Sequence, residues 1–584
     1  MTTTEMTFKI GGEAGQGVES SGAGFAKALA RAGWHIFGIQ DYYSRIRGGH
    51  NFYQIRVSDQ PVYSHVQPVD LLLALTQEAV DRHCDEITPG GGVICEECLE
   101  LDCAALDERN VSYFRVPLTD IAEDKGGAEV MRNTAALGAA AGMIGFPFEV
   151  MASVIEDNFG KKGANVVKSN LSVAEAAYQF TQDNYADAFG YRLSRIEDAP
   201  PRMVVDGSQA LSLGALLAGC KFVAGYPMTP ATGVLQWMAG HGERYGVVVK
   251  HTEDELAAIL MVIGAAHMGV RAMAPTSGGG FSLMTESLGL AGITETPIVL
   301  VEAQRPGPAT GLATRTEQGD LLFVLHASQG EFPRIILSPG TIEECFEAGW
   351  RAFNLAEQYQ CPVIILSDNF LANSVRSIDL DALDFSGVQI ERGQLLTDQD
   401  LDTLEGPYLR YALTESGVSP RAMPGHPRAV FLATGNEHAP DGHLTEEMEP
   451  RRLQVEKRLR KLEGALKEMR GPVPYGPDEA EWTFVGWGST YGPLREAVDM
   501  LVSQGTTANM LHLRDVWPFP ADHVQEALSN AERTVMVEGN ATGQMASILE
   551  AQIGMKLDYH IHRYDGRPFS PQYILSRLEE VQHG

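Results

Sequence analysis

The chain has 584 residues, of which 44% are hydrophobic and 21% are charged, a composition typical of folded globular domains. This length predicts several domains, each with its own core. Lys and Arg number 45 against 76 Asp and Glu, so the formal net charge is −31, which argues against nucleic acid or an anionic membrane as a partner. No apolar run is long enough to span a membrane, the N-terminus lacks a signal-peptide pattern, and seven cysteines suit a reducing compartment. We therefore expect a large, acidic, cytoplasmic protein.

The first block, residues 1–195, opens with the apolar run MTFKI, then the glycine-rich stretch GGEAGQG, then the helical pattern SSGAGFAKALARAG. A strand, a glycine turn and a helix in this order place backbone N–H groups where a phosphate could bind. The stretch lacks the Gly-Lys-Ser/Thr ending of a Walker motif and is an imperfect dinucleotide fingerprint. A tight turn that packs the helix on the strand is therefore an equal alternative.

A small basic corner follows in the sequence RIRGGHN, in a chain that is otherwise very acidic. It contains Arg45 and Arg47 next to Gly48 and Gly49. A solvated loop and a site for a phosphorylated ligand both fit this pattern, and the sequence leaves both open.

Four of the cysteines lie in the first block, three of them within CEECLELDC. A Cys-x-x-Cys pair can bind zinc or an iron–sulfur cluster, but no second pair follows, so we expect no metal site here. These residues are Cys84, Cys95, Cys98 and Cys103. The other three cysteines are expected in hydrophobic cores: Cys220, Cys345 and Cys361.

The second block, residues 196–385, alternates apolar strands with helical stretches: KFVAGY, VVVKHTE, RAMAPTS, TPIVLVEA, RIILSP and CPVIILSD are the strands. This alternation predicts a doubly wound parallel sheet, the α/β class, whose loops meet at the carboxyl ends of the strands. The loops there are YPMTP, TEDE, TSGGGFS and QRPGPATGLATRTEQGD, so we expect the ligand chemistry at that edge.

The third block, residues 386–584, again contains strand-like runs separated by helices, with a charged helical insertion near 443–470. In this insertion Val455, Leu459, Leu462, Leu466 and Met469 recur at steps of four and three, which predicts an apolar stripe that packs on this chain or on a partner.

Three acids begin the helical stretch ELAAILMVIGAA: Glu253, Asp254 and Glu255. Acids in a first turn commonly stabilise the helix, and this explains at least two of them. A carboxylate at the head of so apolar a helix would also be desolvated, which raises its pKa and suits a group that shares a proton.

The order of the motifs YPMTP, Glu255, TSGGGFSLMTE, TGLATR, GNEH, VGWGSTYGPLREA, VWPFP, VEGNATGQ and YDGRPFSP resembles the 2-oxoacid:ferredoxin oxidoreductase family. The likeness is to α subunits, above all those of 2-oxoglutarate:ferredoxin oxidoreductases, and it covers nearly the whole chain. The first block resembles the family's γ subunit, fused ahead of α. Gly279 and Ala313 stand where the family often has proline, which puts the rigidity of those loops in doubt.

This resemblance implies three domains: a γ-type α/β domain (1–195), a thiamine-pyrimidine-binding doubly wound parallel sheet (196–385), and a transketolase-C-terminal-like α/β domain (386–584). It also implies thiamine diphosphate as cofactor. Glu255 would hydrogen-bond the aminopyrimidine N1′, with Glu253 as the fallback. Thr229, held rigid by the prolines of YPMTP, and Arg315 would bind the substrate carboxylate.

The resemblance assigns further contacts in the same loops. Tyr226, Pro227, Ser277 and Gly278 would contact the cofactor, Gly278 by letting the backbone approach. Arg305 would either contact the ligand or have a packing or gating role.

The activity implied is oxidative decarboxylation of 2-oxoglutarate with coenzyme A and ferredoxin, in either direction. Arg45, Arg47, Gly48 and Gly49 would contact coenzyme A. No Gly-Asp-Gly with a downstream Asn and no 4Fe–4S cysteine set occurs. A β subunit is therefore expected to supply the diphosphate site, Mg²⁺ and the cluster, in a dimer of αβ heterodimers. Pyruvate or a branched-chain 2-oxoacid as substrate, and a non-catalytic nucleotide-binding or scaffold subunit, are the alternatives.

Overall fold

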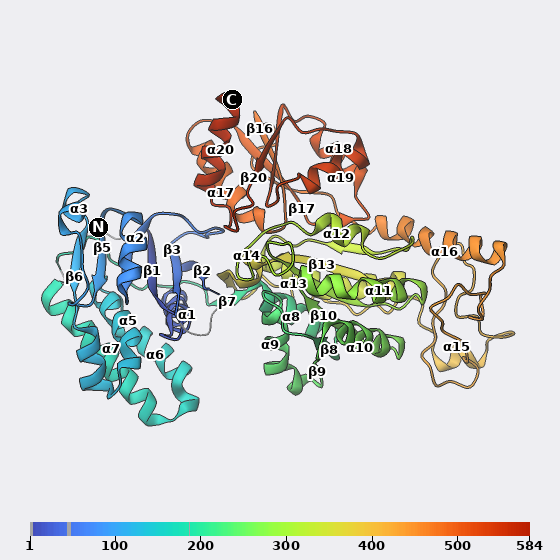
Figure 1. The fold of residues 1–584 in the computed structure, drawn as a ribbon, viewed down its shortest axis with the longest axis horizontal. Helices are drawn as coiled ribbons and strands as arrows, with labels where there is room; N and C mark the ends of the chain where they lie inside the picture. Colours follow the sequence, from blue (N-terminus) through green and yellow to red (C-terminus); the bar gives the residue numbers. More distant parts are fainter. Residues whose placement is uncertain (1–3, 44–47, 186, 584) are drawn as a thin grey trace. The chain divides into compact units, whose positions relative to one another are not determined.

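The computed structural model describes residues 4–43, 48–185 and 187–583; residue 583 is described for its backbone only. The chain forms two compact units, both drawn in Figure 1. Unit 1 comprises Met1–Val205, Ser374–Ala382 and Ser570–Gln572. Unit 2 comprises Asp206–Asn373, Leu383–Phe569 and Tyr573–Gly584.

The first sheet, in unit 1, has eight strands in the order β6-β5-β4-β1-β3-β2-β14-β7. β1 pairs antiparallel with β3 and parallel with β4, so the sheet is mixed. The strands are β1 (Glu5–Glu13), β2 (His35–Asp41), β3 (His50–Ser58), β4 (Val69–Ala74), β5 (Ile87–Cys95), β6 (Ser112–Arg115), β7 (Arg202–Asp206) and β14 (Val375–Asp379).

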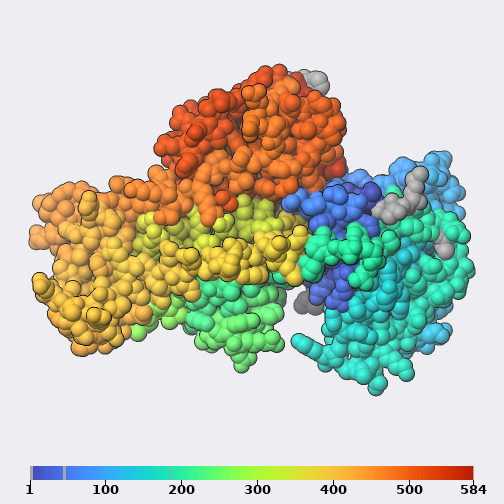
Figure 2. Space-filling view, turned by 180° about the vertical axis from the view of Figure 1, so that it is seen from behind, coloured from blue at the N-terminus to red at the C-terminus, as the bar shows by residue number. Residues whose placement is uncertain are grey.

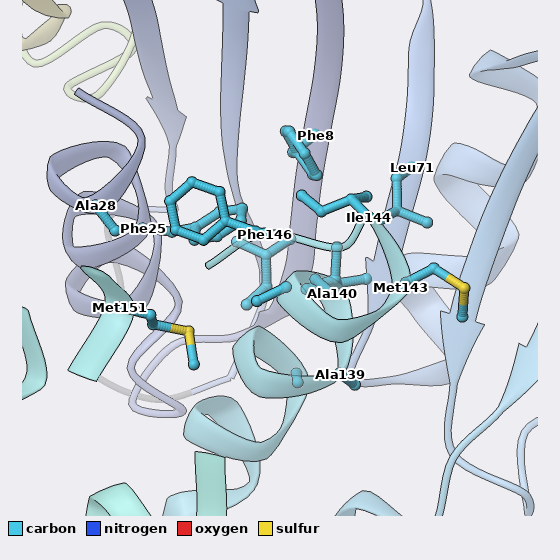
Figure 3. Close-up of a cluster of buried hydrophobic side chains, with 14 of the residues drawn as sticks. Phe8, Phe25, Ala28, Leu71, Ala139, Ala140, Met143, Ile144, Phe146 and Met151 are labelled. Carbon is cyan, nitrogen blue, oxygen red and sulfur yellow. The ribbon is translucent and has the colours of Figure 1, made fainter. Parts of the chain in front are cut away.

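The core of unit 1 lies between this sheet and its helices (Figure 3). Phe8 of the sheet packs edge-to-face on Phe25, which packs in turn on Phe146, with ring centroids 5.2 and 6.0 Å apart. The predicted strand, glycine turn and helix are confirmed as β1, the turn and α1. The helices are α1 (Val18–Arg31), α2 (Gln77–His83), α3 (Cys103–Glu108), α4 (Leu118–Ile121), α5 (Arg132–Met143), α6 (Phe148–Phe159) and α7 (Ala164–Tyr185).

Unit 2 contains a seven-stranded sheet in the order β18-β12-β13-β11-β10-β8-β9, in which only β18 is antiparallel to its neighbour. All six strands predicted for the second block are present. They are β8 (Phe222–Gly225), β9 (Val248–His251), β10 (Ala272–Thr276), β11 (Val299–Gln304), β12 (Ile335–Leu337) and β13 (Val363–Asp368). The helices before, between and after them are α8 (Gly207–Leu217), α9 (Thr232–His241), α10 (Glu255–His267), α11 (Gly278–Ile293), α12 (Leu321–His326), α13 (Ile342–Tyr359) and α14 (Asn369–Asn373).

A five-stranded sheet, also in unit 2, has the order β15-β17-β16-β19-β20. The segment that follows β17 forms β18 (Asp515–Trp517), which pairs with β12 at the edge of the seven-stranded sheet. The α/β class is thus confirmed in all three sheets. The elements are β15 (Val473–Tyr475), β16 (Trp482–Trp487), β17 (Ala508–Leu513), β19 (Arg533–Glu538), β20 (Tyr559–His562), α17 (Tyr491–Ser503), α18 (Ala521–Leu528), α19 (Gln544–Ile553) and α20 (Pro571–His583).

A long segment of little regular structure joins β14 to α16 (Met448–Leu466) and contains only the short helix α15 (Asp398–Asp402) among its described residues. In Figure 2 it runs, in yellow and light orange, over the surface of unit 2. Among the described helices of the chain, none is both long and apolar enough to cross a membrane.

Helix α16 buries a different face from the one the sequence predicts. Leu466 of the predicted stripe is 42% exposed, and Val455, Leu459 and Leu462 are only half-buried. Met469, beyond the end of the helix, is the one member of the stripe that is fully buried. The buried residues of α16 are mainly polar: Gln454, Lys457, Arg458, Lys461 and Ala465.

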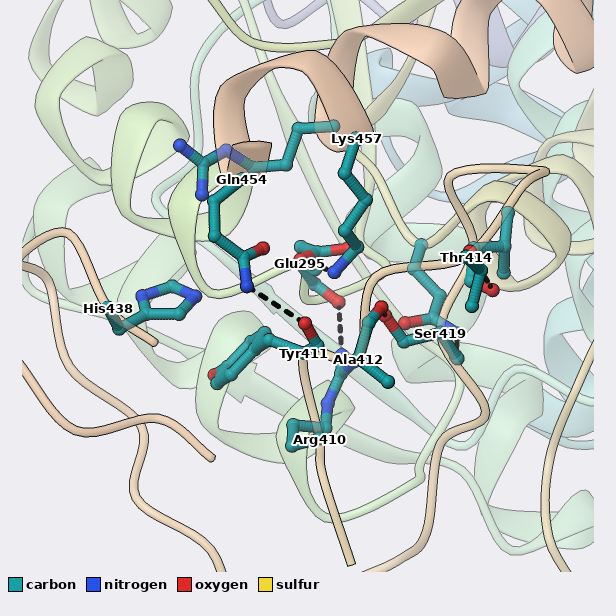
Figure 4. A network of polar contacts seen from close by, with 12 residues as sticks. Glu295, Arg410, Tyr411, Ala412, Thr414, Ser419, His438, Gln454 and Lys457 are labelled. Carbon is teal, nitrogen blue, oxygen red and sulfur yellow. Dashed lines mark hydrogen bonds and ion pairs between the residues drawn. The ribbon is translucent and has the colours of Figure 1, made fainter. Parts of the chain in front are cut away.

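This polar face is buried because it meets a carboxylate that is completely enclosed, Glu295 (Figure 4). Lys457 and Lys461 place their ammonium groups 2.7 and 2.5 Å from its two oxygens. The Arg410 guanidinium donates to the Glu295 backbone carbonyl at 2.8 Å. Burial alone would raise the pKa of Glu295, but the two lysines and Arg410 outweigh it and hold the pKa well below its usual value.

Glu295→Gln should destabilise the fold strongly, because it leaves two buried ammonium groups without a counter-charge, at a cost of about 3–5 kcal/mol. The measurement is the thermal unfolding midpoint, with hydrogen exchange along α16 as a local reading. Glu449→Gln on the same helix removes only an exposed partner of Arg452 and should leave the midpoint unchanged. Equal midpoints for Glu295→Gln and Glu449→Gln would show that the buried cluster does not hold α16 in place.

Candidate functional site

The candidate site lies where the loops after β8, β9, β10 and β11 meet, at the carboxyl edge of the parallel sheet, as predicted. Contacts between these loops fix it. A guanidinium nitrogen of Arg305 donates to the Thr229 carbonyl at 2.8 Å. Gly278 lies against the Asp320 carboxylate, and Gly280 lies against Glu255. The predicted residues Thr229, Glu255, Gly278 and Arg305 therefore come from four different loops.

The structure distinguishes the three acids before α10. Glu253 is exposed, and Asp254 is the N-cap, whose carboxylate accepts the Ala257 N–H at 2.7 Å. Glu255, the first residue of the helix, is only 3% exposed. No described group donates to its buried Oε1. A buried acceptor normally has a hydrogen-bond donor, and here a ligand can supply it.

Helix α11 begins with a glycine turn that approaches two acids, Asp320 and Glu255, very closely. A Cβ on Gly278 would lie 2.4 Å from Asp320 Oδ2, and a Cβ on Gly280 would lie 2.6 Å from Glu255 Oε1 and 2.2 Å from Thr276 Oγ1. Only glycine fits at either position. Ser277, the N-cap, is fully buried, and its hydroxyl has no partner among the described residues.

Arg305 hydrogen-bonds to the YPMTP loop, whose first two residues are exposed. Tyr226 and Pro227 are exposed, Thr229 is half-buried, and the Thr229–Pro230 peptide is cis. Arg305, which the sequence left open between ligand contact and packing, has a packing contact here through the Thr229 carbonyl. Burial lowers the pKa of its guanidinium, while Asp320 and Glu302 act in the opposite direction.

Arg315 lies in the loop between β11 and α12, half-buried, with its backbone N–H bonded to the Leu312 carbonyl at 3.1 Å. A Cβ on Gly566 would lie 3.1 Å from Arg315 Cβ, so the YDGRPFSP segment packs on this loop. Gln318 fixes the same loop to the five-stranded sheet. Its backbone N–H donates to the Gly539 carbonyl at 2.6 Å, and its side chain spans the Trp487 carbonyl and the Gly539 N–H.

Sequence reasoning missed three acids beside this site: Glu302 and Asp368, both enclosed, and Asp320, which is half-buried. Glu302 lies inside the run TPIVLVEA, whose apolar character indicated only a core strand. The single available signal was a carboxylate in the middle of so apolar a strand, because a buried acid needs a partner or a proton.

In unit 1 the predicted glycine turn and glycine corner lie together. The Ala14 N–H donates to the Gly49 carbonyl at 3.3 Å, and Glu13 pairs with His50 across β1 and β3. Gly48 and Gly49 have φ values of 73° and 82°, a conformation that glycine adopts freely. Arg45 and Arg47 lie outside the described residues. His50, next along the chain, is buried and shares a 2.7 Å contact with His83.

The cysteines lie apart from this chemistry. The three predicted in cores, Cys220, Cys345 and Cys361, are buried. Of the four in unit 1, Cys95 is buried and Cys98 is exposed. Within the described part of the chain, no group of three His, Cys, Asp or Glu residues is placed to hold a metal ion.

Three known families match successive parts of the chain. Residues 7–180 match the family described as "Pyruvate ferredoxin/flavodoxin oxidoreductase". Residues 213–457 match "Pyruvate flavodoxin/ferredoxin oxidoreductase, thiamine diP-bdg", and residues 480–574 match "Pyruvate:ferredoxin oxidoreductase core domain II". The candidate site lies within the thiamine diphosphate-binding match.

Whole-length relatives agree with these matches. A 2-oxoacid:ferredoxin oxidoreductase α subunit of Aeropyrum pernix is 33% identical, over 99% of this chain and 98% of its own. The 2-oxoglutarate oxidoreductase subunit KorA of Mycobacterium tuberculosis is 29% identical, over 94% and 87%. A solved 2-oxoglutarate:ferredoxin oxidoreductase from Magnetococcus marinus, with 2-oxoglutarate, coenzyme A and succinyl-CoA bound, matches with a TM-score of 0.90 and 32% identity over 99% of both chains.

Gly280→Ala should lower the thiamine diphosphate content of the purified protein, because the added methyl group displaces the Glu255 carboxylate from its place. The content is measured by denaturing release and chromatography, beside the thermal unfolding midpoint. Gly240→Ala is the matched control, since a Cβ there meets no atom within 4 Å. Wild-type cofactor content in Gly280→Ala would mean that Glu255 is free to move without consequence.

Proposed function

Because the chain belongs to the 2-oxoacid:ferredoxin oxidoreductase family, as an α subunit with a fused γ-type domain, we propose that it oxidatively decarboxylates 2-oxoglutarate. The products would be succinyl-CoA, CO₂ and reduced ferredoxin. The observation that carries this proposal is the whole-length likeness to the Magnetococcus enzyme, which has 2-oxoglutarate, coenzyme A and succinyl-CoA bound. The relative KorA subunit points to the same substrate.

The residues of the candidate site fit thiamine diphosphate. Its thiazolium, when bound, supplies the carbon nucleophile that a 2-oxoacid needs for decarboxylation. The unpartnered Glu255 oxygen would accept a hydrogen bond from the aminopyrimidine N1′ and hold the proton there, which favours the imino form of that ring. Ser277 and Gly278 would let the ring approach the α11 turn, and the exposed Tyr226 and Pro227 would border it.

The substrate carboxylate would bind between Thr229 and Arg315. Thr229 offers a hydroxyl, and its loop is held in place by Arg305. Arg315 offers a two-pronged guanidinium and sits on a loop that Gln318 fixes to the five-stranded sheet. Both side chains are half-buried, so a ligand can reach them while the supporting loop stays rigid.

A β subunit would complete the enzyme by supplying the diphosphate and Mg²⁺ site and a 4Fe–4S cluster, in a dimer of αβ heterodimers. Helix α10, which begins with Glu255, supports this. It exposes a row of large apolar side chains, 41–53% accessible: Leu256, Leu260, Met261 and Met268. Such a row is typical of a surface that a protein partner covers.

Coenzyme A would bind in unit 1 at Gly48 and Gly49, together with Arg45 and Arg47. The juxtaposition of this corner with the β1–α1 turn supports the assignment, since both offer backbone groups at one place. Pyruvate or a branched-chain 2-oxoacid is the competing substrate. The discriminating group would be a second cation for the distal carboxylate of 2-oxoglutarate, which the partner could supply.

Glu255→Gln should abolish turnover, because an amide neither holds the proton at N1′ nor stabilises the imino form. Co-expressed with its β partner under anaerobic conditions, the wild-type protein should reduce a viologen dye with 2-oxoglutarate, coenzyme A and thiamine diphosphate. The exposed Glu253→Gln is the control and should keep wild-type turnover.

Pyruvate and 2-oxoisovalerate complete the substrate panel. Turnover with one of these alone would overturn the substrate and keep the role of Glu255. Loss of turnover in Glu253→Gln but not in Glu255→Gln would exchange the two roles. Absence of a partner, of bound thiamine and of dye reduction would favour the scaffold alternative.

Leu260→Asp should weaken assembly with the β subunit about tenfold or more, because it places a charge in the covered apolar row. Affinity purification through a tag on the β chain, followed by quantitation of the α chain, measures this. Val502→Asp is the control, since Val502 is 47% exposed, close to the 47% of Leu260, but lies on α17. Equal loss of assembly in both variants would contradict the proposed surface.

A further inference from the structure

Two carboxyl groups beside the candidate site have too few hydrogen-bond donors for two negative charges. Glu302 on β11 is completely buried, and no described group donates to either of its oxygens. The carboxyl group of Asp320, the N-cap of α12, lies within hydrogen-bonding reach of it. Two carboxylates in contact repel each other, and they form a hydrogen bond only when one of them carries a proton.

The third acid of this region does not need that proton. Asp368, at the end of β13, accepts hydrogen bonds from the Thr316 hydroxyl at 3.2 Å and from the Leu371 N–H at 3.0 Å. Its charge is therefore met by donors of its own. The missing donor is thus confined to the pair formed by Glu302 and Asp320.

The charges around the pair favour one shared proton. Burial, followed by the Asp320 and Asp368 carboxylates, raises the pKa of Glu302 well above its usual value. Burial likewise raises the pKa of Asp320 to about 6. Arg305 is the cation that acts on both groups, and Glu317 is the remaining acid that interacts with Asp320. At neutral pH the proton therefore resides mainly on Glu302, although the two groups titrate as a unit.

This pair touches both halves of the candidate site. Asp320 Oδ2 occupies the space in front of Gly278, where a Cβ would lie 2.4 Å away. Arg305 interacts with both acids and donates at 2.8 Å to the carbonyl of Thr229. The charge of the pair thus acts on the loop that contains Thr229 through the Arg305 guanidinium.

We propose that Glu302 and Asp320 are positioning residues that share one proton, and that this proton keeps Arg305 bonded to the Thr229 loop in the geometry that binds the 2-oxoacid. With the proton present the pair carries one negative charge. When pH rises and the proton leaves to solvent, the pair carries two, attracts Arg305 more strongly and weakens its bond to Thr229. The effect belongs in substrate binding, so it changes KM and leaves kcat nearly constant.

The kinetic part of this inference rests on the proposed function, and the spectroscopic part does not. Infrared difference spectra of the purified αβ complex between neutral and alkaline pH should show loss of the C=O stretch of a protonated carboxyl group. Glu302→Gln should lack the part of this change that comes from the pair, because the amide supplies the missing donor permanently. Asp320→Asn should lower the pKa of Glu302, because it removes the negative charge that raises it and adds an amide donor, so the carboxyl band should be lost at a lower pH than in wild type.

Asp206→Asn is the matched control. Asp206 caps α8, and burial raises its pKa to about 7, so it contributes its own infrared change away from the site. Removing it should take away only that contribution. In wild type and in Asp206→Asn, KM for the 2-oxoacid should rise about fivefold toward alkaline pH, the size expected when one hydrogen bond is weakened. In Glu302→Gln, KM should stay flat.

A carboxyl change in Glu302→Gln as large as that of wild type, or an alkaline rise in KM that survives in Glu302→Gln, would overturn the proposal. A wild-type complex that turns over no 2-oxoglutarate at any pH would refute the proposed substrate instead, and the infrared spectra would still report whether the proton is shared.

Discussion

The cost of burying a carboxylate organises unit 2. Where cations are supplied, the buried acid becomes a fixed point of the fold: Glu295 receives two lysines from α16, and Glu357 receives three arginines, with contacts of 2.6 to 3.0 Å. Where no described group supplies a donor, as at Glu255 and Glu302, the acid lies in or beside the candidate site. A buried carboxylate without a hydrogen-bond donor destabilises the fold. Such a carboxylate is therefore expected only where a ligand supplies the donor or a proton neutralises the charge.

The parallel sheet explains why the residues of the candidate site meet. Strands that all run in one direction deliver every following loop to the same edge, so Glu255 after β9, Ser277 after β10 and Arg305 after β11 converge although they are far apart in the chain. Helix α11 can begin among them only because Gly278 and Gly280 have no side chains. The close approach requires glycine opposite Asp320, at position 278, and opposite Glu255, at position 280.

The sequence predicted much of this arrangement and missed the parts that depend on tertiary contacts. Apolar runs at regular intervals were enough for the six strands predicted in the second block. The roles of Thr229 and Glu255 came from the family resemblance and stay predictions. The buried face of α16 was predicted wrongly, because periodicity assigns apolar side chains to the interior and Lys457 is buried only by the distant Glu295. Glu302 was missed for the same reason, because its possible role depends on its contact with Asp320, which lies beyond the next loop.

The site is also supported from outside the sheet that builds it. Gln318, from the loop that carries Arg315, bonds to backbone groups of two strands' ends in the five-stranded sheet, near Trp487 and Gly539. Movement of that sheet would therefore move the loop with the substrate-binding cation, while the Glu255 end of the site stays anchored in α10. Cofactor and substrate would thus be held by different supports within one unit. Because both supports are fixed by contacts within the chain, the geometry that the cofactor and the substrate need is in place before either binds.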